Sequence, residues 1–413
     1  MRCCLEKFPP YPRRLESGGF GSSRTRVSPG ETAGAILADM KPPPSIHTAA
    51  PEELGGPARH KGRGAASNRA GRFETRSSTR EDDGWVPEEA LEDPARPRTQ
   101  VSIETARSII SRNDSPDLGF VQSVNPYRGC EHGCVYCYAR PSHGYLNLSA
   151  GLDFETKLFA KANAAQLLRA ELGKRGYVCS PINLGANTDP YQPIERRHAI
   201  TRGVLEVLSE THHPATIVTK NALVERDIDL LADMARRRLV HVFVSITSLD
   251  NRLSAALEPR ASAPHRRLKA VETLVAAGIP CGVMVAPVIP FVTDQFMESI
   301  LERAAAAGAG VAGYTVLRLP YEVKDLMREW LALHLPERAA HVMNVLREMR
   351  GGRDNDPEFG SRMRGQGAYA ELLRQRFAVA CRRFGLNRGR EALDLDGARF
   401  VPPRPESPQG ELF

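Results

Sequence analysis

Three cysteines, Cys130, Cys134 and Cys137, lie together in the stretch Cys-Glu-His-Gly-Cys-Val-Tyr-Cys and constrain this chain more than any other feature of its sequence. Their spacing lets all three thiolates converge on one metal centre from a single short loop. A disulfide would leave one cysteine unpaired, and residues this close along a chain seldom meet disulfide geometry. The spacing therefore predicts a metal site.

Spacing alone does not choose the metal. A [4Fe–4S] cluster held by three thiolates keeps one iron open, and this loop offers three. A closed zinc site takes four protein ligands, so His132 or His143 would have to supply the fourth. A loop without any metal is the third alternative. Gly129 and Gly133 suit a bulky cluster, because they let the backbone approach it closely and leave amide groups free to point at its sulfurs.

The wider sequence around these cysteines favours the iron–sulfur alternative. The pattern Cys-x-x-x-Cys-x-x-Cys followed by an aromatic residue, here Tyr138, closely resembles the signature of the radical SAM superfamily. The stretch from Asn125 to Arg140 is similar to the branch related to spore photoproduct lyase, often labelled DNA-repair-photolyase-like. The resemblance extends from about Ser123 to Leu386. It implies a [4Fe–4S] cluster and S-adenosylmethionine (SAM) as cofactors.

Strand and helix patterns alternate after the cysteine loop. Six such alternations with short connections indicate an α/β fold with a parallel sheet and helices outside it. Periodicity does not distinguish an open sheet from a curved barrel, and the resemblance implies a partial (β/α)6 barrel. The expected strands are 120–127, 178–184, 215–219, 239–246, 281–287 and 311–317, and the expected helices are 156–172, 196–209, 227–238, 262–278, 294–307, 323–333, 336–350 and 369–384.

Composition divides the chain into four parts. We expect a disordered, basic, Pro- and Gly-rich tail at 1–98, a radical SAM core at 99–320, a helical C-terminal extension at 321–387 and a Pro-rich tail at 388–413. The first tail carries a basic stretch between Arg59 and Arg80. This stretch is either an electrostatic arm for nucleic acid or a solvated run of charge, and the acidic residues that follow it favour the second reading.

Polar residues at the ends of the expected strands are the candidates for SAM binding. Thr188 and Asp189 lie in the turn after the second strand, which matches the loop that receives the SAM amino group in relatives. Lys220 closes the third strand, as a SAM-binding lysine does in the spore-lyase-like branch, and Ser245 matches a SAM-contacting serine of that branch. Tyr138 completes this group beside the cluster. Each could instead be an ordinary turn or surface residue.

Two further candidates follow the fourth and fifth strands. Arg260 could bind the SAM carboxylate in a bidentate fork, or could form a structural pair with Glu258. Ala286, with the prolines that follow it, suits backbone contact with an adenine ring. Cys179 and Cys281 begin strands, so we expect them at the far end of the barrel as buried apolar residues.

The net charge and the cysteine content indicate which partners and which compartment suit this protein. The formal net charge of +7 and the isoelectric point near 9.0 permit an anionic partner without requiring one. Eight cysteines without regular pairing suggest a reducing compartment. The sequence shows neither an apolar run of membrane-spanning length nor the apolar core of a secretory signal. We therefore expect a cytoplasmic protein without a membrane partner.

The resemblance implies an enzyme that cleaves SAM reductively and uses the 5′-deoxyadenosyl radical to abstract hydrogen from a substrate, with a flavodoxin- or ferredoxin-like electron donor. It assigns no catalytic side chain. Spore photoproduct lyases carry a cysteine near the second-strand turn, and here Gly185-Ala-Asn-Thr188 has none. The missing thiol disfavours DNA-lesion repair of that type, which is the first alternative. A zinc-bound module that binds nucleic acid is the second.

The loop at 351–367 is the sequence's indication of a substrate. It alternates glycines with cations, and Arg362 and Arg364 could bind a phosphate or a carboxylate. In a basic chain this favours a large anionic substrate such as nucleic acid, although a solvated loop between helices would have the same composition.

Overall fold

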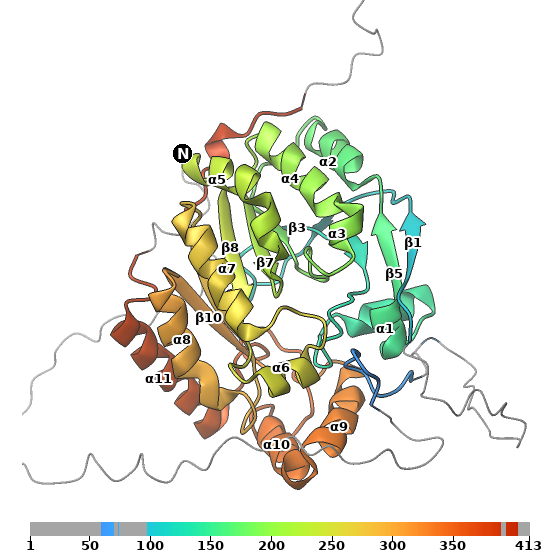
Figure 1. Cartoon of the computed structure of the whole chain (residues 1–413), viewed down its shortest axis with the longest axis vertical. Helices are drawn as coiled ribbons and strands as arrows, with labels where there is room; N and C mark the ends of the chain where they lie inside the picture. Colours follow the sequence, from blue (N-terminus) through green and yellow to red (C-terminus); the bar gives the residue numbers. More distant parts are fainter. Residues whose placement is uncertain (1–58, 70–72, 74–96, 390–393, 404–413) are drawn as a thin grey trace, which may run out of the picture.

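A computed structural model describes residues 59–69, 73, 97–389 and 394–403 (Figure 1). Most of the expected N-terminal tail, with residues 70–72 and 74–80 of its basic stretch, lies outside the described residues, as do 390–393 and 404–413 of the expected C-terminal tail. No helix within the described ranges is both long enough and apolar enough to cross a membrane.

A seven-stranded sheet forms the centre of the fold (Figure 1). Six of its strands are parallel and adjacent in chain order, and one short strand pairs antiparallel with the first of them at the edge. The parallel strands are β3 (Gln122–Val124), β6 (Ile182–Leu184), β7 (Ala215–Thr219), β8 (Val240–Ser245), β9 (Cys281–Val288) and β10 (Val311–Val316), and the edge strand is β2 (Ile110–Arg112). The predicted partial (β/α)6 barrel is confirmed.

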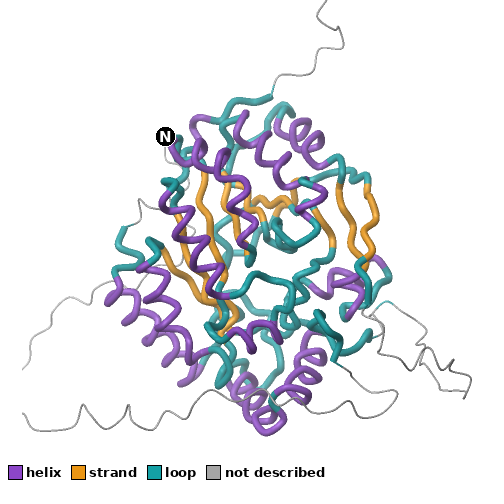
Figure 2. The backbone as a smooth tube through the Cα atoms, in the orientation of Figure 1, coloured by secondary structure: helices purple, strands orange, loops and turns teal. Residues whose placement is uncertain are grey.

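Amphipathic helices cover the outer face of this sheet (Figures 1 and 2). Parallel strands buried on both faces need apolar residues throughout, and Ile217, Val242 and Val283 are accordingly inaccessible to solvent. The helices that connect the strands are α2 (Ala164–Leu172), α3 (Glu195–His198), α4 (Ile200–Glu210), η3 (Ala222–Asp227), α5 (Ile228–Arg236), α6 (Asn251–Leu257), α7 (Pro264–Ala276), η4 (Asp294–Phe296) and α8 (Met297–Ala306).

A second sheet, of three strands, includes part of the segment that was predicted as a helix at 156–172. The predicted helix at 156–172 begins as strand β5 (Lys157–Lys161), and only its second half is helix α2. Leu158 and Ala160 are buried while their neighbours along the strand are more exposed, which is the two-residue period of a strand. Strand β5 pairs parallel with β1 (Gln100–Glu104) and antiparallel with β4 (Tyr127–Arg128). These tertiary partners override a helical pattern of apolar residues.

Helices follow the last strand, as expected. They are α9 (Val323–His334), α10 (Pro336–Glu348) and α11 (Gly367–Phe384), with the 3-10 turn η6 (Gly397–Arg399) near the C-terminal end. Helix α11 lies beside α8 (Figure 1). Helix α6 was not predicted from the sequence. It begins after Asp250, whose carboxylate accepts a hydrogen bond from the backbone N–H of Leu253. The domain boundaries given above stay predictions.

The segment 59–69 belongs to the range expected as a tail, yet it packs against the cysteine loop. The backbone N–H groups of Gly64 and Ala65 donate to the carboxylate of Glu155 at 3.0 and 2.8 Å. Glu155 lies in α1 (Leu152–Thr156), which follows the 3-10 helix η2 (Arg140–Leu146). A Cβ atom at Gly64 would lie 1.8 Å from the carbonyl oxygen of Gly133, so this contact requires a glycine.

Candidate active site

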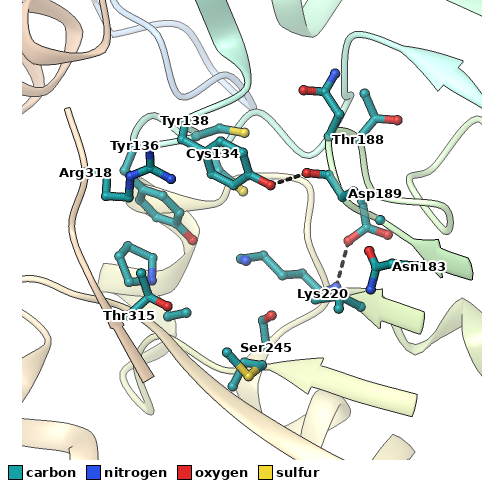
Figure 3. A pocket seen from close by; sticks show the side chains of 18 of the residues that line it. Cys134, Tyr136, Tyr138, Asn183, Thr188, Asp189, Lys220, Ser245, Thr315 and Arg318 are labelled. Carbon is teal, nitrogen blue, oxygen red and sulfur yellow. Dashed lines mark hydrogen bonds between the residues drawn. The ribbon is translucent and has the colours of Figure 1, made fainter. Parts of the chain in front are cut away.

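A cavity of about 440 Å³ opens at the carboxyl ends of the parallel strands (Figure 3). Every parallel strand contributes to its wall. The contributing side chains, in chain order, are Ser123, Asn183, Thr219, Ser245, Ala286 and Thr315. The carboxyl ends of parallel strands meet at one edge of a sheet, which is where α/β barrels place their reactive groups.

The cysteine loop closes one side of this cavity, and Cys130, Cys134 and Cys137 all line it. A buried guanidinium holds the loop in shape. Arg140 donates to the carbonyl oxygen of Cys134 at 2.8 Å and to that of Ala150 at 3.0 Å, and it also forms an ion pair with the fully buried Glu155. The three thiols are therefore placed by hydrogen bonds within and next to their own loop.

The two glycines of the loop lie close against neighbouring elements. A Cβ atom at Gly129 would lie 2.6 Å from Leu158 and 2.9 Å from the ring of His143, and one at Gly133 would lie 2.6 Å from the carboxylate of Glu155. Both residues have positive φ, of 72° and 66°. They let the loop pack against α1 and β5, and their expected part in close approach to a cluster stays a prediction.

Burial makes the three thiols poor acids on their own. It raises the pKa of Cys130 well above the ordinary value and also raises the pKa of Cys134 and Cys137, although the ammonium of Lys220 opposes the shift for the last two. Metal ligands must be thiolates, so a cationic metal centre would supply the charge that this site lacks. The donor set fits an iron–sulfur cluster.

The arrangement differs from that of a single-ion site. Among the described residues, no three His, Cys, Asp or Glu side chains converge closely enough to share one metal ion. Three thiolates from one loop suit a [4Fe–4S] cluster, whereas a closed zinc site takes a fourth protein ligand.

Neither histidine near the loop is placed to complete a zinc site. The side-chain oxygen of Asn221 accepts from Leu223 N–H and from Ser262, so its amide nitrogen is the donor to Nε2 of His132 at 3.1 Å. Nδ1 of His132 then donates to Asp189 at 3.3 Å, which leaves no ring nitrogen free. His143 is buried outside the cavity lining and contacts the carbonyl oxygen of Lys157.

Asp189 lines the cavity as predicted, but its oxygens are occupied. One accepts from the Thr219 hydroxyl and the Tyr191 N–H, the other from the Lys220 N–H and His132. Burial alone would raise the pKa of Asp189, but His132 and these hydrogen bonds outweigh it and lower that pKa. A carboxylate with both oxygens doubly engaged positions other groups, here the end of β7 and the cysteine loop.

Four more predicted residues line the same cavity, namely Thr188, Lys220, Ser245 and Ala286. The Thr188 hydroxyl donates to the carbonyl oxygen of Tyr127 at 3.1 Å, which seats it against the start of the cysteine loop. Lys220 extends into the cavity, with its ammonium 5.9 Å from the centre of the Tyr136 ring (Figure 3). No described residue accepts a hydrogen bond from that ammonium or forms an ion pair with it.

Tyr138 also lines the cavity, and its hydroxyl donates to the carbonyl oxygen of Ala186 (Figure 3). Arg260 is the exception. It does not line the cavity, and it pairs with Glu131 and donates to the carbonyl oxygen of Gly62 at 3.2 Å. The alternative pairing of Arg260 with Glu258 is wrong, because Glu258 is already paired with Arg267.

A buried network that the sequence did not predict lies behind the cavity wall. Glu258 forms an ion pair with Arg267 and accepts hydrogen bonds from Tyr136 and, at 2.6 Å, from Thr247. All four residues are buried. Because Tyr136 belongs to the cysteine loop and Lys220 lies over its ring, this network fixes one wall of the cavity.

This network predicts a pH-dependent contribution to stability. Burial would raise the pKa of Glu258, but Arg267, Lys220 and hydrogen bonds lower it from 4.5 to about 2. A pKa lowered by folding gives stabilisation that is complete above pH 4.5 and lost as pH falls towards 2. At neutral pH, Glu258→Gln should lower the free energy of unfolding by about 3–5 kcal/mol, because it leaves Arg267 buried without a counter-charge.

Urea denaturation at several pH values checks this expectation. Glu302→Gln is a matched control, since Glu302 is an exposed carboxylate on α8. The free energy of unfolding of the wild-type and Glu302→Gln proteins should fall steeply in the acid range. That of Glu258→Gln should be lower at neutral pH and should fall less as the pH is lowered. Parallel profiles for all three proteins would contradict the role given to Glu258.

Several groups that line the cavity were not predicted from the sequence, among them Asn183, Tyr136 and Arg318. Asn183 is a polar residue inside a buried strand, and that pattern was a usable signal; its Oδ1 is buried without a hydrogen-bond partner among the described residues. Tyr136 and Arg318 carried no signal, because their positions depend on Glu258 and on the end of β10.

Comparison with known proteins agrees with this geometry. The family model of the radical SAM superfamily matches residues 124–304. The chain is 37% identical to an uncharacterised protein of Mycobacterium bovis over 272 residues, which is 65% of this chain and 76% of that protein. It is 28% identical to an uncharacterised protein of Methanocaldococcus jannaschii over 189 residues, covering 46% of this chain and 68% of that protein.

Solved structures show the same fold. A structure of spore photoproduct lyase complexed with dinucleoside spore photoproduct aligns with a TM-score of 0.51 and 15% identity, over 69% of this chain and 80% of that one. The structure of a point mutant of spore photoproduct lyase aligns with a TM-score of 0.50 and 16% identity over the same shares.

The chain belongs to the radical SAM superfamily. Its fold is that of spore photoproduct lyase, and its cofactors are those of the superfamily, a [4Fe–4S] cluster and SAM. It is an enzyme of radical chemistry.

Proposed function

We propose that Cys130, Cys134 and Cys137 hold the [4Fe–4S] cluster and that the cavity beside them binds SAM for reductive cleavage. The observation that carries this proposal is the joint lining of one cavity by the three cysteines and by Lys220, whose ammonium has no partner among the described residues. When bound, the cluster supplies the electron that splits the SAM C–S bond, and the resulting 5′-deoxyadenosyl radical abstracts hydrogen from the substrate.

The residues of this chain bind and orient in that proposal. Lys220 offers a cation for the SAM carboxylate, and Ser245 offers a hydroxyl that has no hydrogen-bond partner among the described residues. Ala286, small and at the end of β9, leaves space for the adenine, and Thr188 and Tyr138 complete the wall. Asp189 acts through its hydrogen bonds to the Lys220 backbone and to His132, as a positioning residue.

The alternative functions have less support. Among the described residues, the only cysteines that line the cavity are the three proposed as ligands, so no further thiol is placed to return hydrogen as in spore photoproduct lyase. A zinc-bound module lacks a fourth ligand at this loop, because both nitrogens of His132 are engaged. We therefore propose a radical SAM reaction other than lesion repair.

Nucleic acid as the substrate has less support than the sequence suggested. Arg362 is not free, because its Nε lies 2.6 Å from Asp117 and its Nη2 lies 2.5 Å from the Ser115 hydroxyl. Arg364 is exposed, and its guanidinium lies 5.7 Å from the ring of Tyr314. A flavodoxin- or ferredoxin-like donor and a cytoplasmic location stay part of the proposal, and the free thiols of the described chain agree with a reducing compartment.

An anaerobic assay tests the proposed function. The reconstituted wild-type protein, given SAM and a strong reductant, should release 5′-deoxyadenosine and methionine, and omission of the reductant should stop the release. Protein that reconstitutes with zinc but never with iron would rule the function out. Candidate substrates that accelerate release, or take up label from deuterated SAM, would then be pursued.

A further inference from the structure

A second cation lines the cavity away from the Asp189 side. Arg318 follows β10, and with Tyr138 it lies across the cavity from Asn183 and Asp189, with Lys220 between the two sides (Figure 3). Its guanidinium lies 5.6 Å from the centre of the Tyr138 ring. This contact holds the guanidinium at the cavity wall without neutralising its charge.

No described carboxylate forms an ion pair with Arg318. Its hydrogen-bond contact is a weak one, from Nη1 to the sulfur of Met363 at 3.8 Å, and its buried Nε has no partner in the described part of the chain. The nearby charges do not compensate it, because Asp117 is paired with Arg362. Asp189, the carboxylate on the opposite side, has both oxygens engaged.

A guanidinium in this position destabilises the folded protein unless a bound ligand accepts its hydrogen bonds. A half-buried guanidinium with an unsatisfied Nε loses solvation without gaining a hydrogen bond. Burial and the neighbouring Arg362 accordingly lower the pKa of Arg318. The planar fork of N–H donors matches the two oxygens of a carboxylate or phosphate, and such bidentate pairs are the strongest hydrogen bonds that arginine makes.

We propose that Arg318 is the substrate anchor of this enzyme and binds an oxyanion group, a phosphate or a carboxylate, on the substrate. The inference rests on the proposed function, because it assigns Lys220 to SAM and leaves Arg318 for the second ligand. A substrate held there would lie beside the cysteine loop, since Tyr138 adjoins both Arg318 and Cys137.

Calorimetry on the reconstituted holoenzyme, saturated with SAM so that Lys220 is occupied, tests the anchor. Inorganic pyrophosphate is the phosphate probe and malonate is the carboxylate probe. At least one should bind, and the one that binds more tightly identifies the oxyanion. Arg318→Gln should weaken that binding about tenfold or more, since a charge-assisted pair is lost. Arg353→Gln, which removes an exposed cation from the loop at 351–367, should leave it within about twofold.

Three results separate the outcomes. If wild-type holoenzyme makes 5′-deoxyadenosine but binds neither probe, or if Arg318→Gln binds as tightly as wild type, the anchor is overturned and the proposed function stands. If wild type makes no 5′-deoxyadenosine, the proposed function itself fails. Should Arg318→Gln not fold, Arg318→Lys keeps the charge but loses the fork, and it should still weaken binding severalfold.

Discussion

Replacing Cys130, Cys134 or Cys137 with Ala should abolish SAM cleavage. Each replacement leaves only two of the three thiolates to hold the cluster. No other described cysteine lines the cavity, so none can replace the lost ligand. Wild-type protein should bind roughly four irons per chain after anaerobic reconstitution, with the visible absorption of a cluster, and the three variants should lose both.

Cys179→Ala is the matched control. Cys179 precedes β6 and Cys281 begins β9, so both lie at the opposite end of the sheet from the cavity, as the sequence predicted. Cys281 is buried as expected, whereas Cys179 is only partly buried, so its replacement should cost little stability. The control should keep its iron and its release of 5′-deoxyadenosine. An alanine variant of Cys130, Cys134 or Cys137 with full iron content and undiminished cleavage would refute the ligand assignment.

Lys220→Met should weaken SAM binding by about 1.5–3 kcal/mol, which is roughly a 10- to 150-fold rise in the dissociation constant. Methionine keeps most of the length of the side chain but removes the only charge it offers. The ammonium has no competing partner among the described residues, so its interaction is available to a bound carboxylate. Calorimetry on protein with unchanged iron content measures the effect.

Arg260→Met should change SAM affinity by less than about twofold. It is the comparison for Lys220→Met, because the sequence predicted both residues to bind the SAM carboxylate. In the structure the guanidinium of Arg260 lies outside the cavity lining, where it pairs with Glu131 and donates to the carbonyl oxygen of Gly62. Equal losses for Arg260→Met and Lys220→Met would mean that the cavity closes around SAM with Arg260 inside. Unchanged affinity in both would remove Lys220 from the site.

Features that depend on short stretches of chain could be read from the sequence. The spacing of Cys130, Cys134 and Cys137 brings three thiols to one loop, and the alternation of apolar patterns after them gives six parallel strands in chain order. Candidates at strand ends, such as Lys220 and Ser245, also reached the cavity. Parallel connections bring all carboxyl strand ends to one edge, so position along the chain already determines position in the barrel.

Only the tertiary structure decided which of these groups are free to bind. Asp189 reaches the cavity, but donors from β7 and the cysteine loop fill its oxygens, and Arg260 turns to Glu131 instead. Arg318 gained its role because no described carboxylate reaches it. The availability of a charged side chain is set by partners tens or hundreds of residues away, and one sequence by itself contains no record of those pairings.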